Sequence, residues 1–310
     1  MDRALAGKRV FVAGDRGMVG QALLRRLAGE GCTLLTAPPT LDLRDQAATF
    51  GWLAEHRPDV AVIAAARVGG ILANDSRPAE FLYDNLAIAA NCIEGARKAG
   101  VARLLMLGSS CIYPRDAAQP LVPGALLSGP LEPTNQWYAM AKLAALKLVE
   151  ACRKQYGCDY ISALPCNLYG PGDRYDLAAS HVLPALIRKA HEAKLAGAGE
   201  LVVWGSGTPL REFLHVDDLA EACVTLLARY SGDTPVNIGS SEEITIADLA
   251  RLVAEVVGFS GRIVFDANRP DGTPRKLLDC APMRALGWAP RIALRAGIAD
   301  AYADFLARHG

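Results

Sequence analysis

The sequence has no excess of either charge and no long apolar run, and these absences exclude several classes of protein. Its 33 basic residues are matched by 33 acidic residues over a length of 310. Nucleic acids and anionic membranes attract basic proteins, so neither is expected as the main partner of a neutral chain. The longest apolar runs, such as VAVIAAA at 60–66, are far too short to span a bilayer. An anionic small-molecule substrate would have to be met by a local group of basic residues.

Cysteine pairing of the usual kinds is also missing. The eight cysteines are scattered through apolar segments and form no CxxC pair. This spacing argues against a disulfide framework and against a zinc site. The opening residues, MDRALAGKRV, contain no apolar stretch of signal-peptide length. We therefore expect a cytoplasmic protein with reduced cysteines and no bound metal.

Short apolar segments alternate with segments of helical periodicity over the first half of the chain. The predicted strands cover residues 8–14, 32–37, 59–66, 103–110 and 159–165. The predicted helices between them cover residues 18–31, 45–58, 78–100 and 137–157. Such alternation predicts βαβ units with right-handed crossovers. The expected fold class is α/β, with a Rossmann-type doubly wound parallel sheet.

The alternation becomes looser in the second half of the chain. Helices are predicted at 181–197, 217–230 and 245–258, and strands at 201–205, 235–239 and 262–267. We expect a Rossmann domain over residues 1–170, to which a segment near 211–245 returns. Residues 171–310 are expected to form mainly a smaller C-terminal α/β substrate-binding lobe.

The segment GDRGMVG places Gly14, Gly17 and Gly20 directly after the first predicted strand. In a Rossmann domain these glycines permit a tight turn, a close approach to a pyrophosphate and close helix packing. The second predicted strand ends in TLLTAPPT (33–40), which lacks the carboxylate that NAD-binding proteins use to hold the ribose. Arg16 can instead meet a 2′-phosphate, since a guanidinium matches phosphate geometry. The sequence therefore favours NADP over NAD.

The segment YAMAK places Tyr138 and Lys142 one helical turn apart on a shared face. A phenol with a pKa of about 10 is a poor acid–base group at neutral pH, but a neighbouring ammonium is expected to lower that pKa. Lys142 can also hold the ribose of a cofactor. Ser109 lies at the C-terminal end of the strand predicted at 103–110 and can hydrogen-bond a substrate carbonyl beside Tyr138. A Tyr–Lys pair alone occurs by chance, but with this serine and the glycine turn it indicates a hydride-transfer site.

Longer motifs extend this interpretation over residues 8–300. They are GDRGMVG, AAARVGGILAN, LGSSCIYP, LEPTNQWYAMAK, NLYGPGD, SHVLPAL, VVWGSGTPLREFLHVDDLA and RPDGTPRKLLDC. With these motifs the sequence resembles the extended short-chain dehydrogenases and, among them, the GDP-L-fucose synthases. GSSCIYP, SHVLPAL and DGTPRK are the motifs most specific to that group.

The resemblance implies a two-part reaction on GDP-4-keto-6-deoxy-D-mannose, with GDP-L-fucose as the product. C3 and C5 flank the ketone, so their protons become acidic when Ser109 and Tyr138 stabilise the C4 oxygen. Cys111 and His181 match the pair that the family uses for epimerisation at these carbons, and a thiol and an imidazole suit that proton transfer. NADPH then reduces C4, and Tyr138 supplies the proton.

The resemblance also implies binding residues and an assembly. Together with the glycine motif, it assigns the cofactor to Gly14, Asp15, Arg16, Gly17, Met18, Val19, Gly20, Leu41, Asp42, Leu43, Leu107, Gly108, Ser109, Ser110, Lys142, Pro165, Cys166, Asn167, Leu168 and His181. It assigns the substrate to Lys189, Trp204, Arg211, Asp271 and Lys276. Of these, Arg211 and Lys276 would offset the diphosphate charge. It further implies a homodimer in which the helices over 78–100 and 137–157 form a four-helix interface.

Several positions depart from the family pattern. Asp15 stands where histidine is common, and Pro38 and Pro39 stand where bacterial relatives often carry an arginine. Both changes leave Arg16 to carry the preference for a 2′-phosphate. Cys166 replaces a threonine, and Lys189 replaces an arginine that would contact an anion through two bonds.

Two alternatives remain open at this point. A sugar 4-epimerase or 4,6-dehydratase of the same fold would recycle a tightly bound NAD, but dehydratases carry a threonine and an Asp-Glu pair that GSSCIYP lacks. A non-catalytic dinucleotide sensor would keep the glycine turn, but such proteins typically lose the Tyr–Lys pair.

Overall fold

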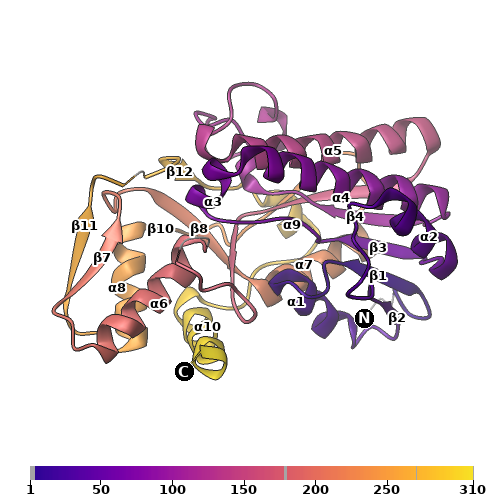
Figure 1. Cartoon of the computed structure of the whole chain (residues 1–310). Coiled ribbons are helices and arrows are strands. Elements are labelled where there is room, and N and C mark those ends of the chain that lie inside the picture. The colour runs from indigo at the N-terminus through magenta and orange to yellow at the C-terminus, as the bar shows by residue number, and fades with distance from the viewer. Residues whose placement is uncertain (1–3, 178–179, 270, 310) are drawn as a thin grey trace.

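The computed structural model describes residues 4–177, 180–269 and 271–309, so Pro270 of the RPDGTPRK motif lies outside the described residues. The largest sheet has six strands in the order β2-β1-β3-β4-β5-β9, and all its pairs are parallel (Figure 1). Its strands are β1 (Arg9–Ala13), β2 (Thr33–Leu35), β3 (Val60–Ile63), β4 (Arg103–Leu107), β5 (Asp159–Pro165) and β9 (Val236–Ile238). The predicted α/β fold with a doubly wound parallel sheet is confirmed.

Helices cover both faces of this sheet. One face carries α2 (Gln46–His56), α4 (Pro78–Lys98) and α5 (Gln136–Tyr156), and the other carries α1 (Met18–Leu27) and α7 (Val216–Arg229). Every residue of β3, with the sequence VAVI, is buried, as expected for a parallel strand with helices on both sides. The apolar runs in the sequence therefore form the central core.

The strand order reverses at β1. The chain passes from β1 to β2 on one side and then returns to place β3 on the other side. In sheets of this kind the crevice beyond the carboxyl ends of the strands at such a point is the usual ligand site. The GDRGMVG turn lies there, because it follows β1 directly.

The second half of the chain adds smaller sheets around a separate cluster of buried apolar residues. Strands β10-β8-β12 form one sheet with β6 paired to β8, and β11 pairs with β7. These strands are β6 (Asn167–Tyr169), β7 (Glu200–Trp204), β8 (Leu210–His215), β10 (Glu243–Thr245), β11 (Arg262–Asp266) and β12 (Arg275–Lys276). The helices are α6 (Val182–Leu195), α8 (Ile246–Val257) and α10 (Leu294–His309), which lie to the left and below in Figure 1.

The predicted elements are present, with several boundaries moved. The strand predicted at 103–110 ends at Leu107, and Ser110–Ile112 forms a short 3-10 helix, η1. Helix α6 begins at Val182, so His181 immediately precedes it. The sequence interpretation missed β6, β8, β10, β12 and α10, the short helices α3 (Ile71–Ser76) and α9 (Ala281–Ala285), and the single turns η2 (Pro123–Ala125) and η3 (Pro133–Asn135).

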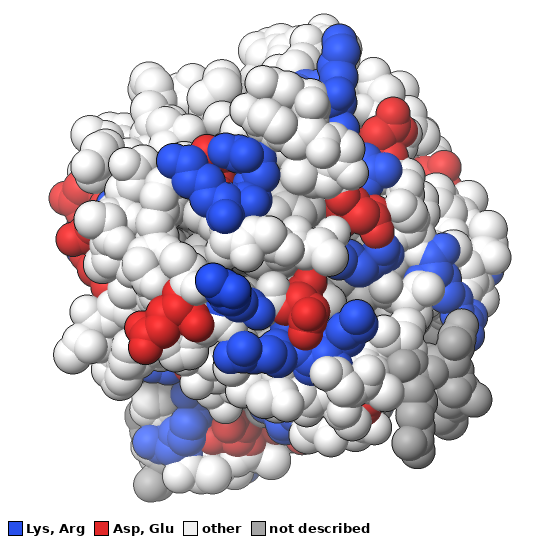
Figure 2. Space-filling view, turned by 90° about the vertical axis from the view of Figure 1, so that its right-hand side faces the viewer, with Lys and Arg blue, Asp and Glu red and all other residues white. Residues whose placement is uncertain are grey.

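Charged side chains of both signs lie on the face shown in Figure 2, where several acidic side chains lie next to basic ones and the basic side chains form the larger groups. Ion pairs such as Arg97 with Glu94 and Arg153 with Asp159 join partly exposed side chains of opposite charge. Within the residues that the structure describes, none of the helices combines the length and the hydrophobicity needed to cross a membrane.

Candidate active site

The three glycines of the GDRGMVG turn have different steric surroundings. Gly14 has φ +88°, and a Cβ added there would lie 2.7 Å from the Ala65 backbone. A Cβ at Gly20 would lie 2.1 Å from the Gly14 carbonyl oxygen. A Cβ at Gly17 would meet nothing closer than 3.5 Å. Packing therefore requires glycine at 14 and 20, whereas Gly17 leaves an open surface beside the start of α1, where a pyrophosphate can approach.

The other predicted adenosine-side residues lie around this turn. Arg16 is exposed and has no ion pair with any described residue, so its guanidinium is free to meet a phosphate. Asp15, Met18 and Val19 are partly buried beside it. In the loop after β2, Leu41 and Leu43 pack against the core. The residues present fit a dinucleotide with a phosphorylated ribose.

Asp42, in the same loop, is already engaged by a neighbouring arginine. Arg44 Nη2 donates to Asp42 Oδ2 at 2.7 Å, and these hydrogen bonds hold the pKa of the Asp42 carboxyl below its usual value. The predicted contact of Asp42 with the cofactor remains a prediction.

Lys142 lies at the centre of the predicted hydride-transfer site. Its side chain is only 4% exposed, its Nζ donates to the Leu107 carbonyl oxygen at 2.8 Å, and burial lowers its pKa to about 8. The ammonium lies 5.8 Å from the centre of the Tyr138 ring. Helix α5 thus brings the two side chains together, as the YAMAK spacing predicts.

The predicted lowering of the Tyr138 pKa is wrong for this structure. Burial raises the pKa of the Tyr138 phenol, and the nearby Cys111 raises it further. The physical reason is that removal of water disfavours the phenolate, while Lys142 directs its ammonium to the Leu107 carbonyl oxygen. Tyr138 is therefore held in its protonated form.

Ser109 and Cys111 lie directly beyond the end of β4. The Cys111 backbone N–H donates to Ser109 Oγ at 3.3 Å, which caps η1 and fixes the two side chains relative to each other. Cys111 is 8% exposed. Burial raises the pKa of its thiol, while the positive charge of Lys276 and a hydrogen bond with Ser109 act in the opposite direction. The thiol thus lies close enough to Lys276 and Tyr138 to influence, and be influenced by, their protonation.

His181 reaches the same region from the start of α6. Its side chain is in contact with solvent, yet the protein around the ring lowers its pKa, and the charge of Lys276 lowers it further. Because Lys276 acts on both His181 and Cys111, the two predicted proton-transfer groups share a neighbour. A lowered pKa favours the neutral imidazole, which can accept a proton.

Two basic residues lie side by side next to these groups. Lys276 of β12 pairs in parallel register with Arg211 of β8, and Arg211 Nη2 donates to the Asp271 carbonyl oxygen at 3.2 Å. Burial lowers the pKa of both basic side chains, which indicates incomplete solvation of their charges. The buried Glu132 acts in the opposite direction on both. An anionic substrate would supply the missing counter-charge.

Comparison with known proteins fits this geometry. Residues 10–239 match the NAD dependent epimerase/dehydratase family. The chain belongs to that family. It is 55% identical to a GDP-L-fucose synthase from Sinorhizobium fredii over 97% of this chain and 96% of the relative. It is 48% identical to a GDP-L-fucose synthase from Escherichia coli over 97% of this chain and 98% of the relative. The resemblance to GDP-L-fucose synthases is confirmed.

A solved structure supports the same relation. The GDP-L-fucose synthetase from Naegleria fowleri bound to NADP has a TM-score of 0.88 with this chain at 28% identity. The match covers 97% of this chain and 93% of that protein. The sheet that carries the glycine turn is therefore shared with a member that holds a nicotinamide dinucleotide.

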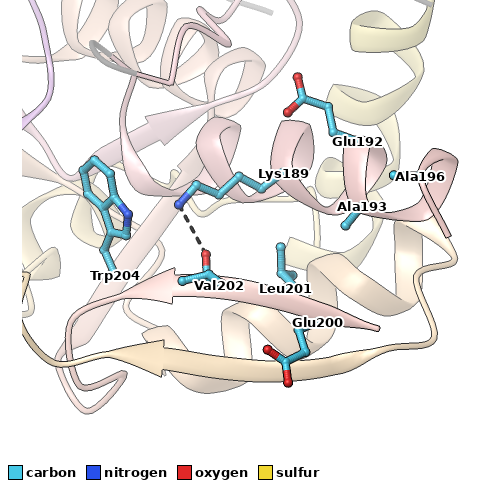
Figure 3. Close-up of a pocket in the computed structure, with 8 residues that line it drawn as sticks. All are labelled: Lys189, Glu192, Ala193, Ala196, Glu200, Leu201, Val202 and Trp204. Atoms are coloured by element: carbon cyan, nitrogen blue, oxygen red, sulfur yellow. Dashed lines mark hydrogen bonds between the residues drawn. The ribbon is translucent and has the colours of Figure 1, made fainter. Parts of the chain in front are cut away.

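Two further predicted substrate residues of this epimerase/dehydratase family member line a groove between α6 and β7 (Figure 3). Lys189 Nζ lies 4.7 Å from the Trp204 ring centre and donates to the Val202 carbonyl oxygen at 3.3 Å. Arg269 lies 4.8 Å from the same ring. Within the described residues, no hydrogen bond or ion pair joins Lys189 or Trp204 to Arg211 or Lys276. The groove thus presents a flat aromatic ring flanked by cations.

The remaining predicted residues of this family member support the site through contacts of their own. Asp271 accepts hydrogen bonds from Ser206 N at 2.7 Å and Ser206 Oγ at 2.9 Å, so its carboxylate holds the turn after β7. Asn167 donates to the Glu212 carbonyl oxygen at 2.9 Å. Of the other members of this set, Leu168 lies in β6. The rest lie at or directly beyond the carboxyl ends of β4 and β5, and they are Leu107, Gly108, Ser110, Pro165 and Cys166.

Sequence reasoning missed Glu132 and Arg44. Glu132 lies in LEPTNQWYAMAK, six residues before Tyr138, and an acid that close to the catalytic helix was the available signal. Arg44 follows the LDL segment in the loop where Rossmann proteins read the ribose. Its position could have indicated a contact near the cofactor, but its partners could not be known without the fold.

Proposed function

We propose that the chain is a GDP-L-fucose synthase that epimerises GDP-4-keto-6-deoxy-D-mannose at C3 and C5 and reduces it at C4 with NADPH. The observation that carries this proposal is the meeting of Ser109, Cys111, Tyr138 and Lys142 at the carboxyl ends of the strands. Identity of 55% to a relative of that name over nearly the whole chain supports the choice of substrate.

The C4 carbonyl oxygen is proposed to lie between the Ser109 hydroxyl and the Tyr138 phenol. Two donors at this oxygen stabilise the enolate that forms when a proton leaves C3 or C5. Cys111 and His181 are proposed to exchange those protons on opposite faces of the sugar. The raised pKa of Tyr138 keeps its phenol protonated, so it can donate to the C4 oxygen during reduction.

NADPH, when bound, supplies the hydride to C4. Gly17 and the start of α1 are proposed to hold its pyrophosphate, Arg16 the 2′-phosphate, and Lys142 the nicotinamide ribose. The free guanidinium of Arg16 and the open surface at Gly17 support this assignment. The Naegleria fowleri relative was solved with NADP bound.

The substrate's diphosphate is proposed to lie against Arg211 and Lys276, and its base near Trp204 and Lys189. Both basic residues of the first pair are incompletely solvated, which supports binding of an anion. In this proposal residues 1–170, with a segment near 211–245, hold the cofactor, and residues 171–310 mainly hold the substrate. The separate apolar cluster of the second half supports that division.

We also propose that the enzyme works as a homodimer in the cytosol. Exposed apolar side chains on α4 and α5 support the dimer. Eight unpaired cysteines support a reducing compartment.

The test is a spectrophotometric assay of reduced-cofactor oxidation with GDP-4-keto-6-deoxy-D-mannose, in which NADPH is compared with NADH. We expect oxidation that favours NADPH and a product that co-migrates with GDP-L-fucose. Equal use of NADH would leave the proposed reaction in place but would overturn the role of Arg16 in binding the 2′-phosphate. Absence of oxidation, together with bound oxidised cofactor in the purified protein, would favour an epimerase or dehydratase that recycles NAD.

A further inference from the structure

A buried carboxylate joins two loops at the cofactor edge of the sheet. Asp84 lies on α4 with 7% exposure, and two arginines from different loops donate to it. Arg67 Nη1 contacts Asp84 Oδ2 at 2.7 Å, and Arg44 Nη1 contacts Asp84 Oδ1 at 3.1 Å. We call Asp84, Arg44 and Arg67 the Asp84 clasp.

The clasp fixes the loops that surround the predicted adenosine site. Arg44 belongs to the loop after β2, and Arg67 belongs to the loop after β3. Ala65, two residues before Arg67, packs closely on Gly14, since a Cβ added to Gly14 would lie 2.7 Å from the Ala65 backbone. Asn85 reinforces the same loop, since its Oδ1 accepts from Arg67 N at 2.9 Å and its Nδ2 donates to Arg67 O at 3.0 Å. Helix α4 thus positions the loop after β3, which packs against the glycine turn.

The clasp also neutralises both guanidinium groups. Arg44 donates to Asp42 as well as to Asp84, and these hydrogen bonds to two carboxylates raise its pKa. Arg67 is shared between Asp84 and Glu80. In a Rossmann domain the loop after the second strand is where the ribose 2′ position is read. Arg44 is therefore a basic residue in the right loop whose charge is already balanced.

We propose that Asp84 is a positioning residue for the cofactor that also sets its specificity. It holds the loops after β2 and β3 in place through Arg44 and Arg67, and it withholds the charge of Arg44 from a 2′-phosphate. The 2′-phosphate is then left to Arg16, so the preference for a phosphorylated cofactor is limited. This inference rests on the cofactor assignment of the proposed function.

The experiment is calorimetric titration with two fragments, adenosine 5′-monophosphate and adenosine 2′,5′-bisphosphate, which need no turnover. The variant is Asp84→Asn, which keeps the side-chain shape and removes the negative charge. We expect weaker binding of the monophosphate, because one side of the clasp loosens. We expect the affinity ratio of bisphosphate to monophosphate to rise about threefold, because a negative charge has left the surroundings of a dianionic phosphate.

Two further variants separate the clasp from general effects. Glu80→Gln makes the same charge change on the same helix, but Glu80 is half-exposed and contacts Arg67 without reaching Arg44. It should leave both affinities close to those of the parent protein. Arg44→Gln removes the other partner of the Asp84–Arg44 hydrogen bond. It should therefore lower the affinity for the monophosphate and lower the affinity ratio of bisphosphate to monophosphate. Circular dichroism and thermal unfolding check that each variant is folded.

Opposite shifts of the ratio in Asp84→Asn and Arg44→Gln would support the proposal. The proposal would be overturned if Asp84→Asn bound both fragments with the affinities of the parent protein, or if it lost affinity for both by the same factor. If that variant does not fold, an unchanged ratio in Arg44→Gln overturns the proposal on its own. A parent protein that binds neither fragment would overturn the cofactor assignment itself, which distinguishes the two failures.

Discussion

The ammonium of Lys142 is a buried charge that donates a hydrogen bond to the Leu107 carbonyl oxygen. Its pKa of about 8 in the folded chain lies below its ordinary value of 10.5. Between these two values the unfolded chain binds more protons, so the free energy of unfolding rises with pH across this window. Below it the charged lysine destabilises the fold. Such a cost is common at residues that serve activity, which is the role proposed for Lys142.

Replacement of this lysine by an apolar residue of similar length should therefore stabilise the protein and abolish its activity. We expect Lys142→Met to raise the free energy of unfolding at neutral pH by about 1–2 kcal/mol, after loss of the bond to Leu107. The gain should shrink as the pH approaches about 10. Urea unfolding at both pH values measures it, and a variant less stable than the parent at neutral pH would contradict the argument.

Cys111 should be required for epimerisation but not for reduction. In Cys111→Ser the hydroxyl is far less acidic than the thiol, so proton transfer at C3 and C5 should fall by about 100-fold or more. The measurement is deuterium incorporation at these carbons in heavy water. Cys32→Ser, at the start of β2 and away from the site, is the control and should exchange like the parent. Unchanged exchange in Cys111→Ser would remove this residue from the mechanism.

Short motifs indicated the proposed catalytic residues because each group lies within a few positions of a recognisable neighbour. Tyr138 and Lys142 share one helical turn, and Ser109 and Cys111 share one strand end. The Asp84 clasp could not be predicted in this way. Asp84 is separated from Arg44 by 40 positions and from Arg67 by 17, so only the folded chain brings them together.

At the scale of elements, we expect the change of glycine to alanine to have opposite effects at two positions of the glycine turn. Gly20→Ala would force a Cβ to 2.1 Å from a backbone oxygen, so we expect a loss of more than about 2 kcal/mol of stability. Gly17→Ala fits the space available in the chain, and its methyl group would cover the surface where we propose that the pyrophosphate approaches. We expect it to keep its melting temperature and to bind NADPH about tenfold more weakly. Thermal unfolding and cofactor titration distinguish the two variants, and equal behaviour would contradict this account.

Most of the elements that the sequence did not predict have no pattern of their own. β12 has two residues and exists because it pairs with β8. β8 has the sequence LREFLH with four successive buried residues, so it shows no alternation. α10 is a different case, since the buried Ile298, Ala301 and Phe305 follow helical spacing and could have indicated it. Pairing between distant segments, which local sequence does not encode, explains the first two.

At the scale of the whole molecule, exposed apolar side chains gather on the outer sides of two packed helices. Tyr83 on α4 is 68% exposed, and Met140 on α5 is 47% exposed. Leu86 is also exposed and lies three residues after Tyr83 on α4, and the exposed Trp137 lies three residues before Met140 on α5. Each pair therefore shares one face of its helix. These helices lie side by side along the top of Figure 1. Apolar surface of this kind is typical of a protein interface.

The dimer is tested by a change of charge on this surface. The double variant Tyr83→Arg, Met140→Arg places two cations on this face of each copy. In a two-fold dimer the face packs against the same face of the partner, so the like charges would lie close together and lose their water. We expect the parent protein to have the mass of a dimer by light scattering and the double variant that of a monomer. Leu195→Arg is the matched control, because Leu195 is 74% exposed on α6, outside this face. A monomeric parent, or a double variant with the parent's mass, would exclude α4 and α5 as the interface.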